Sequence, residues 1–308
     1  QLIFNYILLN SVYHTPVLMD AAISYLINPF IKEEIIVYGT LGGGGYTDCI
    51  LKKISDKGKV ISIDKDINAV NYARERLMNY SKNLIVIQGN FADIRNIISE
   101  LKVDYITGIV LDLGLSSYQL NSEDGFSFLK DSLLDMRADK NAELTASDIL
   151  NNYSESKLIE IFEGYGEIKN SKRLVKSIID KRKKERILMT SDLVKIIQRE
   201  YGLKKNIPYK FFSKIFQALR IAVNNELNDL HKVLDDVVDI LCNKGRIVVI
   251  SYHSLEDRIV KDFFKGRESG TKDIKILTKK VIKPDYKEVK GNNRARSAKL
   301  RAAEVVLI

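Results

Sequence analysis

The chain has 308 residues, 45% of them hydrophobic and 29% charged, which is the composition of an ordinary soluble globular protein with one large domain or two modest ones. Its net charge of +9 and isoelectric point near 9.2 favour a polyanionic partner. The two cysteines, Cys49 and Cys242, lie far apart, which excludes a disulfide framework and a cysteine metal site and suits a reducing cytoplasm.

The first segment, QLIFNYILLNSVY (1–13), is apolar but too short to span a bilayer. It also lacks the basic flank and the small-residue cleavage site of a signal peptide. We therefore expect no targeting segment, no membrane span and a cytoplasmic protein.

Strand-like apolar runs then alternate with helical spacers. The runs are EIIVYGT (34–40), KVISIDKD (59–66), NLIVIQGN (83–90) and YITGIVLDLG (105–114). The spacers between the first three runs carry apolar residues at helical spacing. This alternation predicts an α/β fold with a mostly parallel sheet covered on both faces, and near-continuous apolar strands are typical of such a sheet.

From about 122 to 215 the pattern becomes helical and polar, with no convincing buried strand. The α/β rhythm then resumes with one amphipathic helix over 216–241, a buried strand over 245–253 and a last strand over 299–308. We predict a core formed by 1–121 and 216–308, interrupted by a helical insertion over 122–215. The insertion follows the carboxyl end of a strand, the edge where open sheets bind ligands, so we expect it to serve as a substrate domain.

Positive charge is clustered in two runs. Residues 169–186 hold nine Lys/Arg against two acids, and residues 272–301 hold eleven against three. Either run alone could be a solvated face, but two such runs in a basic chain favour a nucleic-acid partner.

A glycine loop, GTLGGGGYTD (39–48), follows the first strand. Gly45 is followed by Tyr46 and Thr47, so both the phosphate-loop lysine and the last glycine of the dinucleotide motif are missing. Asp64 lies nineteen residues beyond Gly45, the interval at which an acid reaches ribose hydroxyls in nucleotide folds. An adenosine ligand with an amino-acid tail and no phosphates fits this pattern, which favours S-adenosylmethionine; the alternative is a purely structural turn.

Other strand ends carry polar or aromatic residues that should meet at the same edge. Phe91 is suited to form an apolar wall for an adenine ring. Asp112 ends a buried strand, where an unpaired carboxylate is costly, so a functional role is favoured. His253 follows the resumed strand, and structural and functional interpretations of it are equally open.

Long motifs resemble the RsmH (MraW) family of bacterial small-subunit rRNA cytosine-N4 methyltransferases. They are HTPVLMDAA, GTLGGGGYT, SIDKD, LDLGLSSYQL, DGFSF, LDMRAD, YGE, FQALRIAVNNEL, ISYHSLEDRIVK and NNRARSAKLR, in order between residues 14 and 301. The resemblance implies a class I (Rossmann-like) methyltransferase core that uses S-adenosylmethionine on a cytosine of 16S rRNA in the ribosomal decoding region. It also implies small-subunit rRNA as the partner, in the assembled 30S subunit, and allows a homodimer.

Carried over by matching position, cofactor binding would fall on Gly44, Gly45, Tyr46, Asp64, Phe91, Asp112 and Gln119. The chain departs from the family pattern at a strand-end acid and at a histidine of the glycine loop. Tyr38 stands where the family has Asp, and Tyr46 stands where it has His, so Tyr46 could stack or donate a hydrogen bond but could not act as a cation.

The reaction places a weakly nucleophilic cytosine amine against a methyl sulfonium, so the enzyme mainly positions two reactants. We expect Asp112 and the backbone of Leu113–Ser116 to accept hydrogen bonds from the amine, and His253 to orient the substrate or take a proton. For RNA contact we favour five arginines: Arg137, Arg220, Arg258, Arg294 and Arg296. Internal ion pairing is an equally good interpretation of Arg220 and Arg258.

Three other functions stay open at this point. A DNA amino-methyltransferase would share the cofactor pocket but flip its target base. A non-catalytic RNA-binding protein would have lost cofactor use, as Tyr38 and Tyr46 could indicate. A nucleotide-dependent oxidoreductase would need nicotinamide binding, which the glycine loop disfavours.

Overall fold

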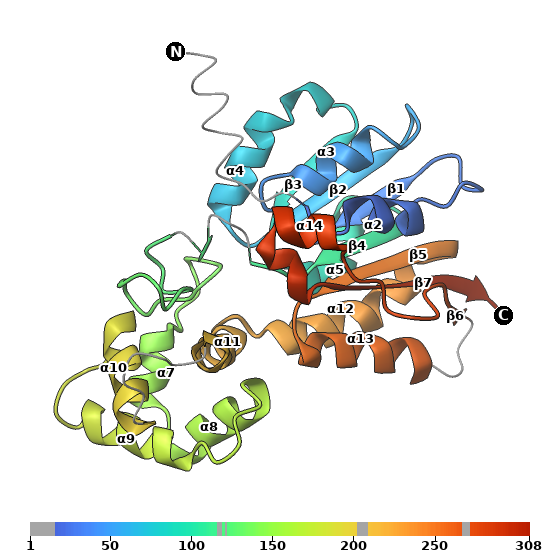
Figure 1. Cartoon of the computed structure of the whole chain (residues 1–308). Coiled ribbons are helices and arrows are strands. Elements are labelled where there is room, and N and C mark those ends of the chain that lie inside the picture. Colours follow the sequence, from blue (N-terminus) through green and yellow to red (C-terminus); the bar gives the residue numbers. More distant parts are fainter. Residues whose placement is uncertain (1–15, 116–118, 121, 202–208, 267–271) are drawn as a thin grey trace. The chain divides into compact units, whose positions relative to one another are not determined.

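The computed structural model describes residues 16–115, 119–120, 122–201, 209–266 and 272–308 (Figure 1). The chain forms two compact units. We call residues 1–116 with 227–308 the sheet unit, and residues 117–226 the helical unit. Tyr118 and Ser116, which belong to the motif LDLGLSSYQL, lie outside the described residues.

The sheet unit contains one seven-stranded sheet of order β3-β2-β1-β4-β5-β7-β6. The strands are β1 (Ile35–Tyr38), β2 (Lys59–Asp64), β3 (Leu84–Gln88), β4 (Ile106–Asp112), β5 (Leu241–Ser251), β6 (Lys272–Ile276) and β7 (Lys299–Leu307). β3, β2, β1, β4 and β5 run parallel, whereas β7 is antiparallel to both β5 and β6. The mostly parallel sheet expected from the sequence is confirmed. The strand order reverses between β1 and β4, so their carboxyl ends form the switch point where such sheets bind ligands.

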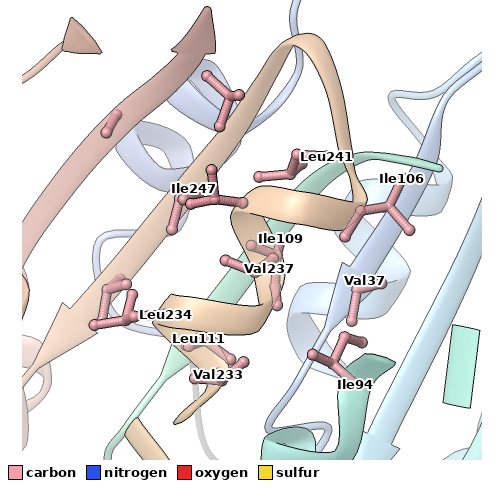
Figure 2. Close-up of a cluster of buried hydrophobic side chains, with 14 of the residues drawn as sticks. Val37, Ile94, Ile106, Ile109, Leu111, Val233, Leu234, Val237, Leu241 and Ile247 are labelled. Carbon is pink, nitrogen blue, oxygen red and sulfur yellow. The ribbon is translucent and has the colours of Figure 1, made fainter. Parts of the chain in front are cut away.

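Helices cover both faces of this sheet. They are α2 (Met19–Leu26), α3 (Gly45–Leu51), α4 (Ile67–Arg76), α5 (Ile94–Glu100), α12 (Glu226–Ile240), α13 (Ser254–Gly266) and α14 (Tyr286–Gly291), with short helices η1 (Met78–Tyr80), η2 (Phe91–Asp93) and η4 (Asn293–Ser297). Successive strand residues enter opposite cores. Val37 and Ile109 pack with α12 residues such as Val237 (Figure 2), whereas Ile36 and Val110 belong to the core on the other face.

The edge strand β6 was not expected from the sequence. Its sequence, KDIKI, alternates charged and apolar residues, and only Ile274 is buried. Lysines are typical of exposed sheet edges because they discourage pairing with other chains. Lys272 also donates from Nζ to the carbonyls of Val238, Asp239 and Leu241. Part of the second basic run is therefore structural.

The single helix predicted over 216–241 is wrong. The structure has α11 (Tyr209–Asn224) and α12, separated by Asn225, whose φ of 55° is left-handed. A right-handed helix cannot continue through that conformation, which asparagine tolerates better than most residues. α11 packs within the helical unit, where Gln217 donates from Nε2 to the carbonyl of Tyr165 at 3.2 Å. Residues 216–226 therefore belong to the helical unit and not, as expected, to the core.

The helical unit otherwise consists of α7 (Ala146–Asn152), α8 (Glu155–Glu160), η3 (Ile161–Tyr165), α9 (Lys172–Arg182) and α10 (Thr190–Glu200). Thr145 begins α7 with a capping box, in which its hydroxyl accepts from the N–H of Asp148 and the Asp148 carboxylate accepts from the N–H of Thr145. Among the described residues of this unit, β pairing is limited to the isolated bridge between Leu133 and Met189. In the described parts of the chain, no helix combines the length and apolar character needed to cross a bilayer.

Gly125, in the motif DGFSF, holds a turn in the helical unit. Its φ is +77°, and a Cβ added there would lie 2.3 Å from the carbonyl oxygen of Leu133. We expect Gly125→Ala to lower the free energy of unfolding by at least about 1–3 kcal/mol, because backbone strain and a clash with backbone act together. Urea unfolding monitored by circular dichroism measures this, with Gly164→Ala as control because a Cβ at Gly164 meets no atom within 4 Å. Equal stability of the two variants would contradict the expectation.

Candidate active site

The glycine loop leads from the end of β1 into α3. Gly44 is the N-cap residue of α3 with a φ of 76°, and a Cβ there would come within 2.9 Å of Leu77 Cδ1. The guanidinium of Arg76 donates to the carbonyl of Gly43 at 2.6 Å. The loop is therefore held from the side of α4, and its glycines permit a close turn of bare backbone.

Asp64 ends β2 and ties that strand to the glycine loop. Its Oδ2 accepts the N–H of Gly42 at 2.7 Å, and its Oδ1 accepts the N–H of Asp66 at 3.0 Å. Burial raises the pKa of Asp64 to about 6, although these two N–H groups act in the opposite direction. Each oxygen keeps capacity for a second hydrogen bond, so Asp64 fits a role toward ribose hydroxyls.

Asp112 ends the neighbouring strand β4. Its side chain is buried, and Oδ1 has no hydrogen-bond partner among the described residues. Burial raises the pKa of Asp112 to about 7, partly opposed by the nearby Tyr252 hydroxyl and the N–H of Gly114. Tyr252 is close enough to act on this pKa, but its hydroxyl does not reach hydrogen-bond geometry. A buried carboxylate oxygen without a partner is costly, which points to a ligand or substrate group that satisfies it.

A pocket opens at the carboxyl ends of β1 and β4, between the glycine loop and Asp112. It is lined by Pro16, Tyr38, Thr40, Leu41, Gly42, Gly43, Gly45, Tyr46, Asp112, Gly114 and Leu115. The structure thus brings together three residues that the sequence analysis assigned to the cofactor: Gly45, Tyr46 and Asp112. Sequence analysis missed Thr40, whose hydroxyl oxygen accepts the N–H of Asp112 at 2.9 Å.

Tyr38 and Tyr46 form one wall of this pocket. Their ring centroids are 5.3 Å apart, and both side chains are almost completely buried. Burial, with added repulsion from Asp112, raises the pKa of both phenols well above the usual value, so both stay neutral. The Tyr46 hydroxyl donates to the carbonyl of Val17, next to Pro16. Tyr46 can therefore meet a ligand through its ring, while its hydroxyl holds the chain at the lip of the pocket.

Phe91 lies at the same edge of the sheet but does not line this pocket. It begins η2, and its Cβ would lie 3.0 Å from a Cβ added to Gly39 at the end of β1. Lys65 Nζ lies 6.0 Å from the ring centroid and forms an ion pair with Asp229 at 2.6 Å. Gln119 belongs to the helical unit, so its role toward the cofactor stays a prediction.

His253 is placed at the start of α13, where it makes capping contacts. Its Nδ1 accepts the N–H of Glu256 at 3.4 Å, and its Nε2 lies 2.9 Å from Glu256 Oε1. Glu256 Oε2 accepts the N–H groups of Tyr252 and His253. The Nε2 contact lacks hydrogen-bond geometry, so this buried nitrogen has no hydrogen-bond partner among the described residues, and the catalytic role of His253 stays a prediction.

The five arginines proposed for RNA contact differ in their surroundings. Arg137 binds Asp135 through two nitrogens at 2.8 and 3.0 Å, and Arg220 pairs with Glu226 at 2.8 Å. Internal ion pairing is thus the better interpretation of these two. Arg258 and Arg296 are exposed, and Arg294 is half-buried.

Comparisons with known proteins agree with this geometry. The model of the MraW methylase family matches residues 11–306. A protein of Clostridium botulinum strain 657, named ribosomal RNA small subunit methyltransferase H, is 42% identical over 315 residues, covering 95% of this chain and 99% of the relative. A protein of the same name from Dictyoglomus thermophilum is 44% identical over 294 residues, covering 94% and 96%. These matches confirm the methyltransferase class and its cofactor expected from the motifs. The pocket residues fit S-adenosylmethionine, because the buried Asp112 oxygen and the backbone of the glycine loop are polar groups that can bind it. The chain belongs to the MraW methylase family.

Proposed function

We propose that this protein transfers a methyl group from S-adenosylmethionine to N4 of a cytidine in small-subunit (16S) rRNA, near the ribosomal decoding centre. The observation that carries the proposal is the buried, unpartnered Oδ1 of Asp112 in the pocket beside the glycine loop. The relatives named as ribosomal RNA small subunit methyltransferase H supply the substrate class.

The cofactor, when bound, supplies an electrophilic methyl group on sulfur. Asp64 and the glycine loop would hold its ribose and amino-acid ends, and the rings of Tyr38 and Tyr46 would exclude water from one side. Asp112 would accept a hydrogen bond from the cytosine amine, which favours the pyramidal geometry that frees the nitrogen lone pair. Its pKa of about 7 also suits it to take the proton that the product must lose, since a general base works best near the operating pH.

The test is methyl transfer from labelled cofactor to small-subunit rRNA isolated from a strain that lacks this gene, followed by nucleoside analysis. The proposal requires label in N4-methylcytidine. Parallel reactions with naked 16S rRNA, assembled 30S subunits and duplex DNA separate the substrate forms. Label in another nucleoside, or transfer to DNA alone, would overturn the proposed substrate.

The non-catalytic alternative rests on Tyr38 and Tyr46, which replace the acid and the histidine of the family pattern. Both are neutral and buried in the pocket wall, so neither offers a charge to a ligand at these two positions. Calorimetry with S-adenosylmethionine separates the two functions, because a protein that has lost cofactor use would show no saturable heat. The role of the helical unit as the substrate domain, the homodimer and the cytoplasmic location stay predictions.

Cofactor affinity is expected to depend on pH. Below about pH 6 Asp64 takes up a proton and can no longer accept hydrogen bonds on both oxygens. We therefore expect the dissociation constant of S-adenosylmethionine to be constant above about pH 7 and to rise about tenfold per pH unit below about pH 6, as for linkage to one proton. Calorimetry between pH 5 and pH 8 measures this on the Asp112→Asn variant, because the carboxyl group of Asp112, with a pKa raised to about 7, would otherwise titrate in the same range. A dissociation constant that stays constant down to pH 5 would remove Asp64 from cofactor binding.

A further inference from the structure

One surface of the sheet unit carries an exposed tyrosine among lysines that form no ion pair with any residue that the structure describes. Tyr286 opens α14 and is 81% exposed. Lys283, Lys287, Lys290 and Arg296 surround it in sequence and are exposed as well. We call these five residues the α14 patch.

None of the basic side chains of the α14 patch forms an ion pair with a described residue. The acidic side chains within this segment accept hydrogen bonds from backbone N–H groups. Asp285 caps α14 by accepting the N–H of Glu288 at 2.7 Å, and Glu288 accepts the N–H of Leu18 at 2.6 Å. These two carboxylates keep their charge but are outnumbered by the four basic side chains of the patch, so the segment remains net positive.

Other basic residues of the run 272–301 form ion pairs or hydrogen bonds within the protein. Lys299 and Arg301 both pair with Asp257, at 3.1 and 2.7 Å, and Lys272 donates to three backbone carbonyls. Some basic residues of the run 272–301 thus have structural contacts, whereas others, including those of the α14 patch, are exposed. Within the described residues of this run, the α14 patch combines exposed cations with an exposed aromatic ring.

The backbone that carries the patch is fixed at both ends. Ile282 and Leu300 exchange N–H···O=C hydrogen bonds at 3.1 and 2.8 Å, and Asn292 caps η4 by accepting the N–H of Arg294 at 3.2 Å. Val289 packs against the hydrophobic core of the sheet unit. Tyr286 is therefore presented on an ordered element, which lowers the entropic cost of using it as a binding surface.

The α14 patch lies beside the pocket. Glu288 of α14 accepts the N–H of Leu18, the N-cap residue of α2, and Figure 1 shows α14 next to α2. Val17, which precedes Leu18, accepts the hydroxyl of Tyr46, and Pro16 lines the pocket. Two hydrogen bonds therefore connect α14 to the pocket wall.

We propose that the α14 patch binds single-stranded RNA next to the methyl-transfer pocket, with Tyr286 stacking on a base and the four cations contacting phosphates. Proteins that bind single strands combine these two features, since every base has a stacking face and every nucleotide carries a phosphate. The inference rests on the proposed function and deepens it, because it assigns the surface along which the substrate strand leaves the pocket.

The first experiment measures the affinity for a fluorescein-labelled single-stranded RNA of about 12 nucleotides by anisotropy, at several salt concentrations. We expect Tyr286→Ala to raise the dissociation constant about tenfold at every salt concentration. We expect the triple variant Lys283→Gln/Lys287→Gln/Lys290→Gln to reduce the log–log salt slope by about 2, because each phosphate contact contributes about 0.7. The control is the double variant Tyr105→Ala/Lys102→Gln. It changes an exposed tyrosine and an exposed lysine just before β4, at the amino ends of the parallel strands and away from the pocket.

Thermal unfolding and calorimetry with S-adenosylmethionine show that each variant is folded and keeps its pocket. Wild-type affinity and salt slope in both patch variants would overturn the inference. So would binding of wild-type protein to phosphatidylserine vesicles that is lost in the patch variants while RNA binding is kept. Absence of methyl transfer by the wild-type protein would instead refute the proposed function, whatever the anisotropy shows.

Discussion

Replacing Asp112 by alanine is expected to lower the rate of methyl transfer by at least about a hundredfold while the protein stays folded. The substitution removes the buried oxygen that would accept a hydrogen bond from the cytosine amine and the group that would take its proton, and general-base catalysis contributes about 10²–10⁴-fold. Single-turnover transfer from labelled cofactor at saturating cofactor and RNA measures the chemical step. Full activity in this variant would remove Asp112 from the catalytic assignment.

The isosteric variant Asp112→Asn separates hydrogen bonding from proton transfer, because its amide oxygen accepts a hydrogen bond but takes no proton at neutral pH. It also tests the electrostatics. A folded-state pKa raised to about 7 means that this group's contribution to stability is fully present below its unfolded pKa near 4 and is lost as the pH rises through about 7. We therefore expect the unliganded Asn variant to be more stable than wild type by a few kcal/mol at pH 8 and similar to it at pH 4–5. Lower stability than wild type at pH 8 would show that the Asp112 carboxylate is satisfied in the folded protein.

Replacing Asp64 by asparagine is expected to weaken binding of S-adenosylmethionine by about tenfold to a hundredfold. The carboxylate accepts the N–H groups of Gly42 and Asp66, one on each oxygen. An amide can accept only one of them and turns its NH₂ group toward the other, which leaves a buried donor unsatisfied at a cost of about 1–3 kcal/mol. The glycine loop would lose its register with β2, and the ribose would lose an acceptor.

Asp66→Asn is the matched control for this prediction. Asp66 caps α4 by accepting the N–H of Asn68 at 2.9 Å, and an asparagine side chain keeps that acceptor. Calorimetry should give near wild-type cofactor affinity for this variant and weak binding for Asp64→Asn. Equal affinities for both variants and wild type would show that Asp64 serves the fold of the loop without contributing to cofactor binding.

Much of the fold was predictable because its helices and strands follow from local spacings of apolar residues in the sequence. The apolar runs 59–66 and 105–114 contain the parallel strands β2 and β4, which end at Asp64 and Asp112. The glycine loop follows β1, the strand of the first run, 34–40. β6 was missed because an edge strand buries little, so its alternating lysines look like a solvated face. The break at Asn225 was missed because apolar spacing continues across it, and a single left-handed residue leaves no trace in that spacing.

The candidate site was predictable only in part. Gly45, Tyr46 and Asp112 meet in one pocket because the carboxyl ends of adjacent parallel strands lie together. The contribution of Pro16 and Thr40, and the ion pair of Arg137 with Asp135, were not visible in the sequence, which left the ion pairing of Arg220 open. They depend on which side chains come within about 3 Å of one another after folding, and residue type does not specify that.

By itself, the sequence determined the alternation of strands and helices, the preference for a nucleoside ligand without phosphates, and the family motifs. These follow from periodicity and spacing, which are local properties of the chain. Only the tertiary structure determined which charged side chains form internal ion pairs and which are available to bind a partner. Leu18 and Glu288, 270 residues apart, share one hydrogen bond that joins α14 to the pocket wall, and the Asp112 oxygen lacks a partner because of where β4 ends. Such pairings arise only when the sheet brings distant segments together, because hydrogen bonds and burial depend on distance in space and not on distance along the chain.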